Sequence, residues 1–181
     1  MPEPQAAPTS SALGLAARLL RLHPVLVSLL WLGGLVMALA GPALFGPIAY
    51  AAAFALLATY FGWWLLWALE IDRRARGAMS EPERPYMRKL ARWVFATGLV
   101  SGVLVGALEV LGLGGDDQPW FIKAPMDLLA LATIAPLLVM LWTAASAHAR
   151  SFGPVPGGQR TLLTFLGLYF APVGVWFIKP R

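Results

Sequence analysis

Cysteine is absent from this 181-residue chain, which excludes disulfides, thiolate metal sites and cysteine nucleophiles. Charged side chains are scarce, because they make up 13% of the residues, whereas hydrophobic side chains make up 59%. Ordinary soluble domains have about 25% charged and roughly 45–50% apolar residues. A lipid-embedded helical bundle, in contrast, needs polar groups only at its ends and in its interior. The composition therefore predicts an all-α protein, a polytopic transmembrane helical bundle.

Recognisable catalytic motifs are missing as well. The sequence has no glycine-rich phosphate loop, no HExxH motif and no Ser/His/Asp set with familiar spacing. Without cysteine, only histidine and carboxylate side chains remain as metal ligands, and the chain has two histidines. Hydrolysis and phosphoryl transfer have no support in these residues, and we expect a non-catalytic protein.

Long apolar runs predict about five membrane spans, with four as the alternative if the last run lies on the membrane surface. Residues 1–12 are rich in Pro, Ala and Ser and are expected to form a mobile tail. A single transmembrane domain should then occupy residues 13–181, beginning with an interfacial helical turn at residues 13–22. The expected spans are residues 23–40, 48–69, 93–113, 122–147 and 161–178.

The distribution of lysine and arginine predicts the orientation. The stretch at residues 70–92 carries seven of these side chains, whereas the link between the first two expected spans carries none. Because positive charge is retained on the cytoplasmic side, this basic loop and the amino terminus should both be cytoplasmic. The expected location is a bacterial inner membrane.

The same basic loop predicts a partner. Its side chains lie beside apolar spans and do not form a groove-sized patch with interleaved aromatic residues, so we expect anionic lipid headgroups and no nucleic acid. Other membrane subunits or a second copy of the chain are further expected partners. The side chains expected to face lipid are Arg73, Arg74, Arg76, Arg88, Lys89 and Arg92.

Three glycines recur every four residues in the third expected span, at Gly98, Gly102 and Gly106. One face of that helix therefore has almost no side chains, and another helix can pack closely against it. Packing within the chain is the simplest interpretation. Contact between copies and close approach of a flat cofactor are the alternatives.

Three ionisable residues, Glu109, Lys123 and Asp127, lie near the expected outer ends of spans three and four. A charge close to hydrocarbon costs a few kcal/mol unless it is paired. Lys123 and Asp127 are four residues apart, which places them on one helix face within salt-bridge reach. The cluster is either an interfacial cap of two helices or a proton or ligand site that opens to the outside.

The two histidines, His23 and His148, fall at the ends of spans one and four, both near the cytoplasmic side. Two histidines on different helices are a common way to hold haem b, so these are the candidate haem ligands. An interfacial polar role is the simpler interpretation of each.

Short motifs suggest a family. The chain has Leu-His at residues 22–23, Trp-Leu-Gly-Gly at residues 31–34 and Trp-Phe-Ile-Lys at residues 120–123. Over about a third of its length it thereby resembles the superfamily of copper-resistance-D-type membrane domains and HemJ-type protoporphyrinogen oxidases. The resemblance implies bound haem and functional roles for a histidine and a lysine, whose places would be taken by His23 and Lys123.

Three functions follow as hypotheses. The first is a small non-catalytic helical subunit or packing partner in a membrane complex. The alternatives are a haem-b-associated membrane redox protein and a small transporter that uses Glu109, Lys123 and Asp127. A Soret band in the absorption spectrum of the purified protein would separate the haem hypothesis from the other two.

Overall fold

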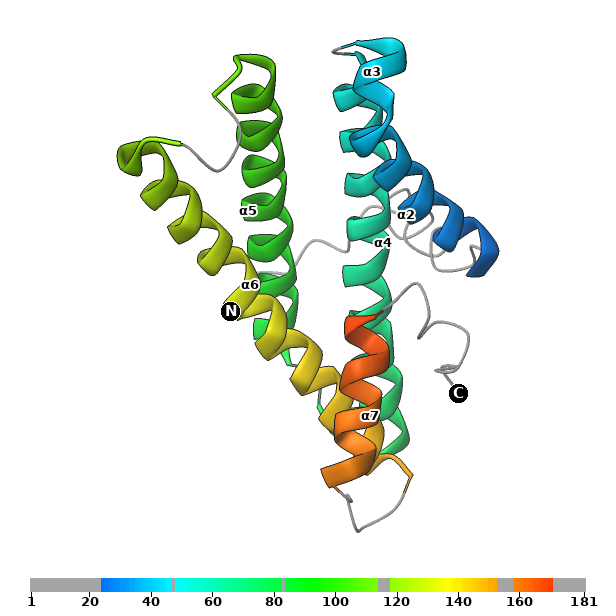
Figure 1. Ribbon diagram of the computed structural model, residues 1–181. Coiled ribbons are helices and arrows are strands. Elements are labelled where there is room, and N and C mark those ends of the chain that lie inside the picture. Colours follow the sequence, from blue (N-terminus) through cyan, green and yellow to red (C-terminus); the bar gives the residue numbers. More distant parts are fainter. Residues whose placement is uncertain (1–23, 47, 83, 114–117, 153–157, 171–181) are drawn as a thin grey trace, which may run out of the picture.

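The computed structural model describes residues 24–46, 48–82, 84–113, 118–152 and 158–170 (Figure 1). The predicted tail, the interfacial turn and His23 lie outside these residues. Within them, the all-α fold class is confirmed. The helices are α2 (Pro24–Leu39), α3 (Gly41–Phe45), α4 (Ile48–Ala78), α5 (Pro85–Val110), α6 (Trp120–Arg150) and α7 (Gly158–Tyr169).

Three helices, α4, α5 and α6, are long and apolar enough to cross a membrane. They have 31, 26 and 31 residues, and at about 1.5 Å per residue each exceeds a hydrocarbon core of about 30 Å. Helix α2 is also apolar but shorter, with 16 residues, and the amphipathic helix α7 has 12. The last expected span, residues 161–178, extends beyond the described residues. These lengths are those of a helical membrane protein.

Helix α4 is central, because α2, α5 and α6 all pack against it (Figure 1). Helices α2 and α3 run back along α4 in the antiparallel direction, since Gly34 of α2 lies beside Leu57 and Gly41 of α3 beside Ala49. Helices α6 and α7 cover the carboxyl-terminal half of α4, where most of the buried core is found (Figure 1). This core includes Trp63, Trp64, Trp67, Met140, Leu141 and Leu168.

A buried hydrogen bond fastens α7 to α4. The indole nitrogen of Trp64 donates to the carbonyl oxygen of Leu168 over 2.7 Å. Leu168 lies in the last turn of α7, where carbonyl groups lack an intrahelical donor. The tryptophan therefore supplies a partner that the short helix does not provide itself.

A second tryptophan joins α5 to α6 at a proline. Pro136 lies inside α6 and has no backbone N–H, so the carbonyl of Ala132, four residues earlier, loses its usual helical donor. The indole nitrogen of Trp93 on α5 donates to this carbonyl over 3.3 Å. The contact therefore supplies a hydrogen-bond donor to a backbone carbonyl that Pro136 leaves without its helical one.

The basic segment at residues 70–92 differs from the expected loop, because α4 continues far into it and α5 begins within it. Acid–base pairs support the helix here, since Glu70 pairs with Arg74 and Asp72 with Arg76, each four residues apart. Hydropathy marks where apolar residues end, not where the helix ends. We call the end of the bundle formed by this segment the charged end.

Candidate functional site

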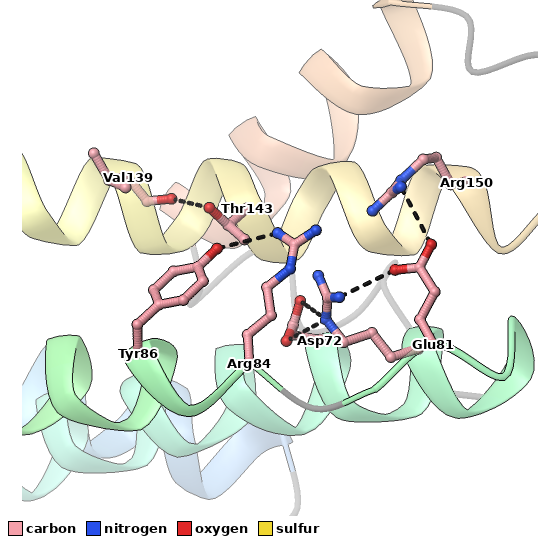
Figure 2. A network of polar contacts seen from close by, with 8 residues as sticks. Asp72, Glu81, Arg84, Tyr86, Val139, Thr143 and Arg150 are labelled. Carbon is pink, nitrogen blue, oxygen red and sulfur yellow. Dashed lines mark hydrogen bonds and ion pairs between the residues drawn. The ribbon is translucent and has the colours of Figure 1, made fainter.

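A partly buried ion network lies at the charged end (Figure 2). The Nε of Arg76 donates to both carboxylate oxygens of Asp72, at 3.1 and 3.0 Å, and both residues are buried. Its Nη1 donates to Glu81 Oε2 at 3.0 Å. Arg150, the last residue of α6, donates from Nη1 to Glu81 Oε1 at 3.3 Å. Glu81 lies in the connection after α4, and its carboxylate joins Arg76 of α4 to Arg150 at the end of α6.

This arrangement corrects the expectation that Arg76 faces lipid. The side chain of Arg76 is only 3% exposed, because two carboxylates surround it between packed helices. Its Nη2 has no hydrogen-bond partner within the described part of the chain. Desolvation of such charges is offset only by their pairing, so the network is sensitive to loss of either partner.

The other predicted lipid-facing residues are exposed. Arg73 and Arg74 both pair with Glu70, at 2.6 Å. Arg88, Lys89 and Arg92 lie in the first two turns of α5. The charged end therefore combines a buried, neutralised interior with a basic surface.

One groove between α4 and α5 starts at this basic surface, and we call it the arginine groove. It has a volume of about 740 Å³, and its body is mostly apolar. Arg88 and Arg92 line it, whereas Lys89 does not. Trp63, Leu66 and Phe95 form part of its apolar wall.

The three glycines of α5 lie in different surroundings. A methyl group added at Gly98 would lie 2.8 Å from the ring of Phe61, and one at Gly102 would lie 2.8 Å from the ring of Phe54. One added at Gly106 would have nothing within 4 Å. Aromatic rings of α4 therefore pack on Gly98 and Gly102, whereas Gly106 has open space beside it.

That open position belongs to a second groove between α4 and α5, which we call the glycine groove. Its volume is about 970 Å³, and it reaches the end of α5 that is remote from the charged end. Trp31, Tyr50 and Phe54 line one side, with Gly102 and Gly106 on the other. Among the described residues that line it, Glu109 alone is charged.

Glu109, Lys123 and Asp127 are all exposed. Between the described helices, no ion pair joins any two of them. Glu109 lies in the last turn of α5 and Lys123 in the first turn of α6, so both lie at the end of the bundle opposite the charged end.

His148 lies in the last turn of α6 and is half-buried. Its ring packs edge-on against Phe152, with 4.9 Å between the ring centres. The cavity that it lines, shared with Arg74 and Ser151, has a volume of about 170 Å³. Typical ligand pockets are about 300–1,000 Å³. Its pairing with His23 around haem stays a prediction, because His23 lies outside the described residues.

Comparison of the chain with known protein families, with curated proteins and with solved structures finds no match. The described residues contain no group of three or more His, Asp or Glu side chains placed to hold a metal ion. Gly33 and Gly34, from one of the motifs behind the family resemblance, pack on Leu56 and Leu57 of α4. That motif therefore has a packing role in this chain.

Two features were missed by the sequence analysis, namely the ion network at the charged end and the arginine groove. The network had a readable signal, because Asp72 and Arg76 are four residues apart and lie just beyond an apolar run. The groove had none, since it depends on how α4 and α5 pack.

Proposed function

We propose that this chain is a small non-catalytic helical subunit of the bacterial inner membrane that forms a homodimer through the glycine groove. The observation that carries the proposal is the open face at Gly106, where the chain leaves a large apolar groove unfilled. Membrane helices associate by close packing on small residues, because lipid offers no hydrophobic drive between them.

A helix of a second copy suits the groove. A symmetric dimer uses the same surface on both partners. If its twofold axis lies along the membrane normal, residues at one depth in one copy meet residues at that depth in the other. Glu109 and Lys123 share one end of the bundle. Their charges would then pair across the interface and offset the cost of placing them near hydrocarbon.

Charge reversal tests this pairing. We expect Glu109→Lys or Lys123→Glu alone to shift the purified protein toward monomer, and the double variant to restore the dimer, because the pair is regained with its signs exchanged. Light scattering of the protein–detergent complex measures the mass. Persistent monomer in the unmodified protein, or no restoration in the double variant, would refute the proposed dimer.

Groove filling gives an independent check. Gly106→Leu should reduce the dimer at least fivefold, while Ala96→Leu, on an exposed face of α5 that lines neither groove, should leave it unchanged. Both variants should retain the unfolding temperature of the parent monomer. Equal effects of the two substitutions would remove the glycine groove as the interface.

We also propose about five spans with a cytoplasmic amino terminus, supported by the excess of lysine and arginine at residues 70–92. The chain has no cysteine, so single introduced cysteines report topology without a background. A cysteine at Ser80 should resist a membrane-impermeant thiol reagent added to intact cells, whereas one at Gln118 should react. The reverse pattern would invert the orientation.

A further inference from the structure

The arginine groove has a charged mouth and an apolar body. Arg88 and Arg92 lie four residues apart on α5, and both are exposed. Helices α4 and α5 are antiparallel, since Gly62 lies beside Phe95 and Gly98 beside Phe61. The two arginines precede Phe95 on α5, so they lie at the end of the groove that opens toward the charged end.

The length of the groove matches one leaflet of a bilayer. Its lining residues on α4 extend from Ala58 to Leu69. At about 1.5 Å per residue, these eleven steps span about 16 Å, close to half of a hydrocarbon core of about 30 Å. A partner helix that crosses the membrane would need a contact surface about twice as long. An acyl chain anchored at a headgroup needs only this depth.

The chemistry of the mouth selects the headgroup. A guanidinium group offers paired donors that match the oxygens of a phosphate, and two such groups carry two positive charges. Anionic phospholipids supply a net negative headgroup and are enriched in the cytoplasmic leaflet, where the charged end is proposed to lie. A zwitterionic lipid has the same phosphate but no net charge.

We infer that the arginine groove binds one anionic phospholipid, with its phosphate at Arg88 and Arg92 and an acyl chain along Gly62, Leu66 and Phe95. The bound lipid fills the space between α4 and α5 on the side of the bundle that α6 and α7 leave open. This site is separate from the proposed dimer contact, since Gly106 and Glu109 line the other groove.

Native mass spectrometry of the full chain tests this site. The protein in detergent is mixed with equal amounts of dioleoyl phosphatidylglycerol and dioleoyl phosphatidylcholine. We expect one phosphatidylglycerol to be retained per chain in preference to phosphatidylcholine. Arg88→Gln with Arg92→Gln should lower that retention about thirtyfold, because both of the charges that contact the phosphate are lost. Lys89→Gln, beside them but outside the groove, should change it less than threefold.

A blocking variant separates the apolar slot from simple charge. Thr59 is exposed and lines the groove, so Thr59→Trp should fill it and lower phosphatidylglycerol retention about fivefold while both arginines remain. Ala96 is exposed and lines neither groove, so Ala96→Trp is the matched control. Added inorganic phosphate in tenfold excess over lipid should not displace the lipid, because it lacks the acyl contacts.

Three results would overturn the site. They are unchanged preference in the double glutamine variant, equal loss in the Lys89→Gln control, and displacement of the lipid by inorganic phosphate. If the double variant fails to fold, Thr59→Trp decides the question alone, and full retention in it would refute the groove. None of these results depends on dimer formation.

Discussion

Replacing Arg76 by methionine should lower the free energy of unfolding by about 3–5 kcal/mol, because it leaves the buried carboxylate of Asp72 without its partner. The hydrocarbon part of the side chain is kept, so the loss comes mainly from the charge. Titration with a denaturing detergent, followed by circular dichroism, measures the change. Arg74→Met is the control, since Arg74 is exposed and its pair with Glu70 should contribute about 0–1 kcal/mol.

Removing both charges should recover much of that loss. Asp72→Leu combined with Arg76→Met leaves no isolated charge at this position, and apolar replacements of buried ion pairs are often neutral or stabilising. Glu81 keeps its second partner, Arg150. A double variant as unstable as Arg76→Met alone would show that the network acts through Glu81 and not through Asp72.

Gly102→Leu should destabilise the fold by about 1–3 kcal/mol, because even a methyl group there would lie 2.8 Å from the ring of Phe54. The same substitution at Gly106 should leave the stability of the monomer unchanged, since nothing lies within 4 Å. The detergent titration described for Arg76 compares the two.

A compensating change on α4 tests the contact directly. Phe54→Ala together with Gly102→Leu removes the ring as it adds the side chain, so part of the lost stability should return. Additive losses in the double variant would mean that the leucine does not meet Phe54, and that the faces of α4 and α5 are paired differently.

The apolar runs predicted the cores of the spanning helices well, and their ends less well. The fourth expected span, residues 122–147, corresponds to α6, which is only a few residues longer at each end. The second, residues 48–69, corresponds to α4, which begins at the same residue and ends nine residues later. The difference has a physical cause, because side-chain pairs such as Glu70–Arg74 keep a helix intact after its residues become too polar for lipid.

The functional residues were harder to predict, because their roles depend on neighbours distant in sequence. The spacing of Gly98, Gly102 and Gly106 indicated a bare helix face, but only packing against Phe61 and Phe54 shows which glycines are filled. Arg76 and Arg88 look alike in a basic stretch. The first is enclosed by carboxylates and the second lines a groove, a distinction set by helix rotation rather than by composition.

The contact between Trp93 and the carbonyl of Ala132 makes two distant positions interdependent during sequence divergence. The indole donor contributes to stability only while residue 136 is a proline, because proline has no N–H to donate to that carbonyl. If Pro136 is replaced first, the carbonyl regains its helical donor and selection on Trp93 is relaxed. If Trp93 is replaced first, the carbonyl loses the donor that compensates for the proline. Substitutions at the two sites should therefore be epistatic, with the order of change favouring Pro136 before Trp93.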